Sequence, residues 1–248
     1  MSFQKEMQKA YSMAQSGRFL EAEVILKKII QKESSEKKFQ ALANLAIILI
    51  NQGNLDRAKE TFEIILDNKF DLTIFRNYQN LLKQQKNWEL LADQCANFIQ
   101  NNQHKDKTTN INYAIALREM GQFDEACSHI NLCIQLDGNE LDYYVSLGFI
   151  LNKNEQYEDA ITIYKKGLLL DPDNLILNYN LGITLKNYNQ TEESIKYLEK
   201  AGSINGNIFD IWITQAGNYI KLNCIEKAFK CIERAKQIEP NNFLIIFN

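Results

Sequence analysis

A pattern of residue types returns every 34 residues, and this period constrains the fold more than any single residue does. The stretches that start at Leu141, Leu175 and Phe209 share the pattern. Each has Leu-Gly or Gln-Ala at its seventh and eighth places, Ala or Ser at its twentieth, and Pro or Gly at its thirty-second. Repetition at this length is typical of solenoids, in which each unit packs only on its neighbours. The function of such a chain then depends on what binds along its surface.

Within one unit, the apolar residues follow the period of an α-helix. One stripe of the second unit has the spacing i, i+3, i+4, i+7 and consists of Leu42, Leu45, Ala46 and Leu49. A second stripe begins at Ala58, and residues 51–54 between the two read Asn-Gln-Gly-Asn, a cluster that ends helices. No stretch alternates with period two for long enough to predict a strand. Each unit is therefore predicted to be two antiparallel helices joined by a short turn.

Two units carry bulky, small and proline residues at the same fixed places. The fifth unit has Tyr144, Leu147, Gly148, Ala160 and Pro172, and the last full unit has Trp212, Ala216, Ala228 and Pro240. This set resembles the pattern W-x2-L-G-x2-Y…A…P of the tetratricopeptide repeat family. The resemblance covers nearly the whole chain. It implies an all-α fold, a right-handed α-solenoid of about seven helix-turn-helix units.

The repeat pattern predicts a single superhelical domain over residues 1–242. Its units lie near 3–38, 39–71, 72–106, 107–140, 141–174, 175–208 and 209–242. The third unit departs from the pattern, because Gln79 and Leu91 replace its small residues and Trp88 falls in its predicted turn, so we expect a looser joint there. Residues 243–248 are predicted to start a further helix or to form a C-terminal cap. The apolar run from Phe243 to Phe247 is also a candidate self-association patch.

The charge balance and the rare residue types argue against several classes of function. The chain has 28 Lys and Arg against 31 Asp and Glu, whereas nucleic-acid binding needs a clustered excess of cations. No stretch approaches the ~20 apolar residues of a membrane span, and Met1 to Ala10 lacks the apolar run of a signal peptide. Five cysteines without a CxxC motif predict free thiols and a cytoplasmic location. His104 and His129 lack the spacing of metal ligands, and no catalytic triad or phosphate-binding loop is present, so we expect no metal, no cofactor and no enzyme activity.

The sixth place of every unit is polar and uncharged. Its occupants are Gln8, Asn44, Asn77, Asn112, Ser146, Asn180 and Thr214. In tetratricopeptide repeats the second, fifth, sixth, ninth, twelfth and thirteenth places tend to face the inner, concave wall. The series resembles the asparagine ladder in the repeats of O-linked N-acetylglucosamine transferase. An Asn amide can pair with both the N–H and the C=O of one peptide unit, so the ladder predicts binding to the backbone of an extended peptide. The alternative is that Asn is ordinary at this place and faces water.

A second arrangement resembles the carboxylate clamp with which some members of the family hold the C-terminal tails of chaperones. Arg76 and Asn80 lie one helical turn apart, and Asn112 stands where the next Asn of the clamp would be. The following unit should supply two basic residues but has Asp142 and Ser146. The clamp is therefore only half present, and Asp142 would repel a carboxylate.

These patterns together predict a non-catalytic protein-interaction scaffold that binds an extended peptide or a helix in its concave groove. Phe149 and Tyr179 stand at inner places and favour a partner with some apolar side chains. The alternative is the N-terminal, substrate-recruiting region of a larger transferase of the glycosyl or methyl type. Both hypotheses predict a protein or peptide partner rather than a nucleic acid or a membrane.

Overall fold

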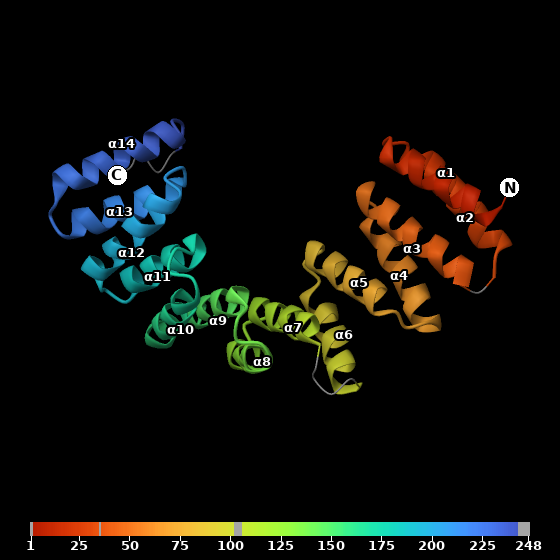
Figure 1. Cartoon of the computed structure of the whole chain (residues 1–248), viewed down its shortest axis with the longest axis horizontal. Helices are drawn as coiled ribbons and strands as arrows, with labels where there is room; N and C mark the ends of the chain where they lie inside the picture. Colours follow the sequence, from red (N-terminus) through yellow and green to blue (C-terminus); the bar gives the residue numbers. More distant parts are fainter. Residues whose placement is uncertain (1, 35, 102–105, 243–248) are drawn as a thin grey trace. The chain divides into compact units, whose positions relative to one another are not determined.

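The computed structural model describes residues 2–34, 36–101 and 106–242, and this part of the chain contains fourteen α-helices and no strand. The first seven are α1 (Phe3–Gln15), α2 (Phe19–Lys32), α3 (Glu36–Asn51), α4 (Leu55–Asn68), α5 (Leu72–Gln84), α6 (Trp88–Asn101) and α7 (Lys107–Glu119). The others are α8 (Phe123–Leu136), α9 (Leu141–Lys153), α10 (Tyr157–Leu170), α11 (Leu175–Asn187), α12 (Thr191–Ile204), α13 (Phe209–Lys221) and α14 (Ile225–Ile238). The predicted all-α solenoid of helical pairs is confirmed (Figure 1).

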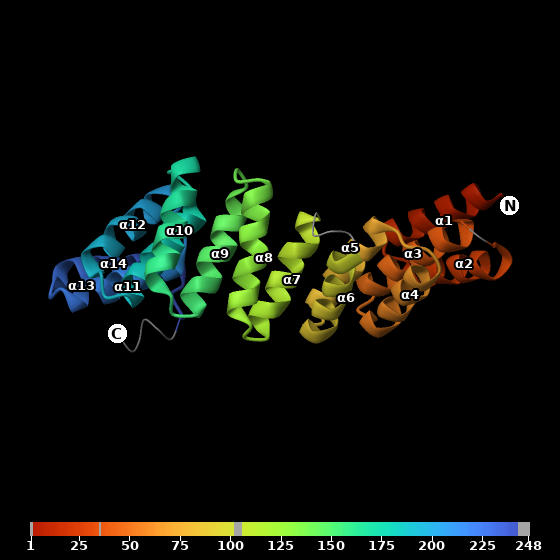
Figure 2. The ribbon, with the colours of Figure 1, turned by 90° about the horizontal axis from the view of Figure 1, so that it is seen from below.

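The chain divides into two compact units, Met1–Ala116 and Leu117–Asn248, and the division falls within α7. In each unit, consecutive helices pack side by side, as the second view also shows (Figure 2). The first helices of neighbouring pairs also touch, α1 with α3 in the first unit, and α9 with α11 and α11 with α13 in the second. The single domain over 1–242 and its repeat boundaries stay a prediction. The run from Phe243 to Phe247 lies outside the described residues.

The short turns between paired helices share one backbone conformation, a residue with positive φ. The α3–α4 turn has Gly53 at φ +74°, and the Asn54 N–H donates to Leu49 O at 2.8 Å, which is the bond that closes a helix C-terminus. The equivalent residues of the other six pairs also have positive φ: Gly17, Lys86, Gly121, Glu155, Asn189 and Asn223. The breaker cluster predicted at residues 51–54 therefore ends its helix as expected.

Trp88 is the first residue of α6, so its predicted place in the turn was wrong. The side chain of the preceding Asn87 accepts a hydrogen bond from the Leu90 N–H at 3.4 Å. This bond partners one of the donors left open at the start of a helix and allows the helix to begin at position 88.

The core follows the helical stripes read from the sequence. In the first unit, Leu42 and Leu49 of α3 are buried together with Ala58 and Phe62 of α4. In the second unit, Gly148 of α9 lies directly against the buried ring of Tyr164 of α10, where a side chain would collide with the ring. The small eighth residue therefore lets the two helices of a pair approach closely, as the pattern predicted.

A buried ion-pair group joins α2 to α4 in the first unit. Glu23 is only 6% exposed, and its carboxylate accepts from Lys27 Nζ at 2.9 Å and from Arg57 Nη2 at 2.7 Å. These two charged hydrogen bonds, from Lys27 first and then Arg57, lower the pKa of Glu23 from 4.5 to about 2. The group thus holds a carboxylate ionised at the interface of two consecutive helical pairs.

We expect Glu23→Gln to lower the stability at neutral pH by about 1–2 kcal/mol, because it weakens two charge-assisted bonds whose cations remain half exposed. Since the folded-state pKa lies below the unfolded value, the wild-type advantage is complete above pH 4.5 and is lost as the pH falls towards 2. Urea unfolding from pH 7 to pH 2.5 measures this difference. The exposed Glu60→Gln serves as the control, and an advantage that does not change with pH would contradict the assignment.

Candidate functional site

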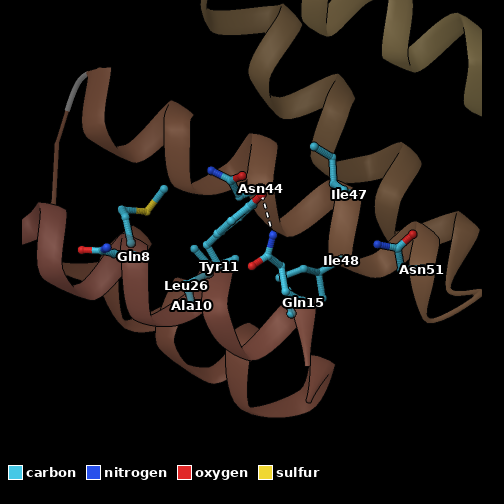
Figure 3. A pocket seen from close by; sticks show the side chains of 11 residues that line it. Gln8, Ala10, Tyr11, Gln15, Leu26, Asn44, Ile47, Ile48 and Asn51 are labelled. Carbon is cyan, nitrogen blue, oxygen red and sulfur yellow. Dashed lines mark hydrogen bonds between the residues drawn. The ribbon is translucent and has the colours of Figure 1, made fainter. Parts of the chain in front are cut away.

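The first helices of the pairs hold the candidate site, because they carry the predicted inner positions. In the first unit, α1 and α3 form a hollow of about 470 Å³ between them, which we call the α1–α3 hollow (Figure 3). It is lined by Met7, Gln8, Ala10, Tyr11, Ala14, Gln15, Leu26, Asn44, Ile47, Ile48 and Asn51. This volume lies in the range of ligand sites, roughly 300–1,000 Å³.

The α1–α3 hollow combines apolar side chains with amides and carries no carboxylate or basic group. Tyr11 is 62% exposed and Ile47 is 44% exposed, so both present apolar surface to an incoming partner. Gln15 Nε2 donates to Tyr11 Oη at 2.9 Å (Figure 3). Asn44 Nδ2 donates to Gln40 O at 3.0 Å. The Asn44 oxygen accepts no hydrogen bond from the part of the chain that the structure describes, which leaves it open to a peptide N–H.

The predicted ladder residue Asn112 has a different environment, because it is only 3% exposed. Its Nδ2 donates to Gln79 Oε1 at 2.8 Å, and its Oδ1 accepts from Lys83 Nζ at 2.8 Å. Gln79, which replaces the small residue of the third pair, is itself fully buried and also donates to Cys95 Sγ at 3.3 Å. Both atoms of the Asn112 amide therefore serve the packing of α5 and α7, and a peptide would have to replace these bonds.

Arg76, one residue of the predicted clamp, also has a hydrogen-bond partner within the first unit. Arg76 Nη2 donates to Asp106 Oδ1 at 2.8 Å, and Asp106 accepts from the Thr109 N–H at 2.8 Å at the start of α7. Burial tends to raise the pKa of Asp106, but the hydrogen bonds from Thr109 and Arg76 outweigh it and lower this pKa. Asn77 is half-buried and Asn80 exposed on the same helix α5. Arg76 thus stabilises the start of a helix.

The second unit has a hollow of about 450 Å³ between α9 and α11, the α9–α11 hollow. It is lined by Phe149, Asn152, Lys153, Glu155, Tyr157, Tyr179, Asn180, Ile183 and Asn187. Three predicted site residues, Phe149, Tyr179 and Asn180, come together here. Burial, and to a lesser degree the charge of Asp210, raise the pKa of Tyr179, so its hydroxyl stays neutral and can donate a hydrogen bond.

The other two predicted residues of the second unit line neither hollow. Ser146 is half-buried on α9, and Thr214 is 9% exposed on α13. The hollows in turn include residues that reading the sixth place alone did not select, among them Tyr11, Asn51 and Lys153. These residues occupy the ninth and thirteenth places of their units, and those places could have identified them.

Residues 2–34, 36–101 and 106–242 hold no group of three His, Cys, Asp or Glu that could bind a metal ion. Burial raises the pKa of Cys95 to about 12 and that of Cys127 to about 11, so neither thiol is a ready nucleophile at neutral pH. Within the same ranges, no helix has the length and apolar character needed to cross a bilayer.

Family models identify the repeats directly. Tetratricopeptide repeat models match residues 13–84, 108–140 and 176–207, and a further TPR repeat model matches 148–187. The chain belongs to the tetratricopeptide repeat family. No curated protein matches the chain in sequence.

Solved structures of tetratricopeptide repeat proteins share this fold. One from Parabacteroides merdae ATCC 43184 is 15% identical with a TM-score of 0.73, over 99% of this chain and 96% of that one. The C-terminal part of a repeat-containing protein from Cytophaga hutchinsonii is 16% identical with a TM-score of 0.74, over 97% and 98%. YrrB, a TPR protein with an unusual peptide-binding site, is 18% identical with a TM-score of 0.59, over 76% and 97%.

Proposed function

We propose that this tetratricopeptide repeat protein is a non-catalytic scaffold that binds a peptide segment of another protein along its first helices. The α1–α3 hollow carries this proposal, because it places exposed Tyr11 and Ile47 beside the open amide oxygen of Asn44. Apolar side chains with a few oriented polar groups are the usual composition of a binding site. A segment bound here would bury an apolar side chain and pair its backbone with amides.

The spacing of the inner amides suits an extended chain. Neighbouring helices lie ~10 Å apart and an extended chain rises ~3.3 Å per residue, so one amide per helical pair would meet every third residue or so. Each such bond contributes only ~0.5–1.5 kcal/mol, so several amides and an apolar anchor must act together. In the first unit, the ladder residues whose amides can serve are Asn44 and Asn77, since Asn112 is committed to internal bonds. In the second unit, Asn180 can serve.

The similarity to YrrB supports the class of function, because that protein has the same fold and a peptide-binding site. The alternative of a recruiting region in a larger transferase stays a prediction.

We expect Ile47→Glu to weaken peptide binding at least tenfold, because it places a charge in an uncharged apolar hollow. Binding is measured by fluorescence anisotropy with peptides selected on the whole chain from a displayed library of random twelve-residue sequences. Ile64→Glu is the matched control, since Ile64 is also exposed, at 49%, but lies on the second helix α4 outside the hollow.

The triple variant Asn44→Ala, Asn77→Ala, Asn180→Ala measures the contribution of the amides to binding separately from that of the apolar anchor. We expect this variant to bind the selected peptides more weakly than the wild type does, whatever their sequences, because the amides would bind the peptide backbone. Failure to select any peptide, or equal binding by the wild type and Ile47→Glu, would overturn the proposed function. Unchanged binding by the triple variant alone would remove the ladder and leave the apolar anchor.

A further inference from the structure

Two cations from different helices approach one aromatic ring beside the α9–α11 hollow. The guanidinium carbon of Arg118, in the last turn of α7, lies 5.1 Å from the ring centre of Phe149. The ammonium of Lys153, in the last turn of α9, lies 5.7 Å from the same centre. Both distances are within the ~6 Å reach of a cation–π contact. Phe149 therefore holds two positive charges next to a hollow that it also lines.

The local acids leave part of this positive charge available. Glu119 Oε1 accepts from Arg118 Nε at 2.9 Å and from Nη2 at 2.6 Å, so the two bonds use one carboxylate oxygen and leave Nη1 for another acceptor. Lys153 forms no ion pair within the described ranges. Glu155 also lines the hollow, and the charge of Asp210 reaches Tyr179, so the available positive charge is confined to the two side chains on Phe149. One further carboxylate, rather than a run of them, suits the open donors Arg118 Nη1 and Lys153 Nζ.

The other residues of the α9–α11 hollow also suit the parts of a peptide that flank an acidic side chain. The Asn152 side-chain oxygen is buried and accepts no hydrogen bond from any described residue, so a backbone N–H is its natural partner. Tyr179 and Ile183 supply apolar surface in the same hollow. Asn180 adds an amide without a bond to another side chain in the described ranges. The hollow thus offers a place for one acid, one apolar side chain and a stretch of backbone.

We propose that the α9–α11 hollow selects a partner segment in which an internal Asp or Glu side chain stands next to an apolar residue. The carboxylate binds Arg118 Nη1 and Lys153 Nζ, and the apolar side chain packs on Phe149 and Tyr179. This inference rests on the proposed function and adds the chemistry of the partner. Cations in the last turn of a helix also complement its dipole, and the experiment must separate that structural role from binding.

The test uses the whole chain and C-terminally amidated synthetic copies of the selected peptides, so that the only carboxylates belong to side chains. We expect selected peptides to contain Asp or Glu beside an apolar residue, and replacement of that acid by its amide to weaken binding about tenfold. In the double variant Arg118→Gln, Lys153→Gln the acidic peptide should bind about tenfold more weakly, and the replacement should have no further effect. Raising NaCl from about 50 to 500 mM should weaken binding by the wild type but not by the double glutamine variant.

The matched control is Lys166→Gln, Lys230→Gln, which removes the same charge from exposed positions of α10 and α14. This control should bind the acidic peptide as tightly as the wild type does. It should also lose affinity to the same extent when the acid is replaced by its amide. The variant Arg118→Lys, Lys153→Arg preserves the charge and should retain most of the binding if its helices remain folded by circular dichroism.

If no selected peptide both contains an acidic residue and binds the double glutamine variant more weakly, or if the acid has an equal effect in the wild type and that variant, this inference is overturned. If the selected peptides still depend on Ile47, the proposed function stands and only the inference fails. Tighter binding of a single-stranded RNA probe than of the acidic peptide, with the same dependence on Arg118 and Lys153, would also overturn it.

Discussion

Gly148→Ala should lower the free energy of unfolding by about 2–3 kcal/mol, although alanine favours a helix over glycine by about 1 kcal/mol. A Cβ at this position would lie 2.4 Å from Tyr164 Cε1 and 2.6 Å from Tyr164 Cζ. Tyr164 is 1% exposed, so its ring cannot move aside without disturbing the packing of α9 on α10. The steric cost therefore exceeds the gain in helix propensity.

Gly217→Ala is the matched control for this prediction. Gly217 lies within α13, and a Cβ there meets no atom within 4 Å. The same chemical change should therefore raise stability by about 0.5–1 kcal/mol through helix propensity alone. Urea unfolding followed by far-UV circular dichroism measures both variants, and opposite shifts of the two midpoints are expected. A Gly148→Ala protein as stable as the wild type would contradict the close packing of α9 on α10.

The opposite changes in stability expected at Gly148 and Gly217 show which features the sequence could predict and which it could not. The repeat pattern assigned a small residue to the eighth place of a unit, so the contact of Gly148 with the second helix was predictable. The helical stripes and the breaker at residues 51–54 were predictable for the same reason, because they depend on local spacing. Local rules of this kind are repeated in every unit, which is why most of the fold could be predicted.

The candidate site was predictable only in part. The sixth place is polar in every unit, but its residues differ in environment: Asn44 lines a hollow, whereas Asn112 is buried against Gln79. Gln79 replaces a small residue, and its side chain needs hydrogen-bond partners that other helices must supply. Such a network joins residues about 30 positions apart, and no rule of spacing within one unit predicts it. The two cations on Phe149 also come from different helices.

Phe62→Ala should remove about 3–5 kcal/mol from the stability of the first unit, because it leaves a cavity in a fully buried position. The Phe62 ring of α4 lies 6.0 Å from the ring of Tyr78 of α5, and both belong to one cluster with Leu45 and Leu81. Tyr78 is fixed in turn by its hydroxyl, which donates to Glu63 Oε1 at 2.6 Å. The substitution therefore removes packing between two consecutive helical pairs.

The loss should also be local, because each pair of helices in a solenoid packs only on its neighbours. Hydrogen exchange resolved by mass spectrometry should show faster exchange first in peptides from α3, α4 and α5, and little change in α9 to α14 of the second unit. Phe229→Ala is the control, since Phe229 is 59% exposed on α14, and its removal should change stability by less than about 0.5 kcal/mol. Uniformly faster exchange along the whole chain would mean that the two compact units unfold as one, and that cooperativity extends beyond nearest neighbours.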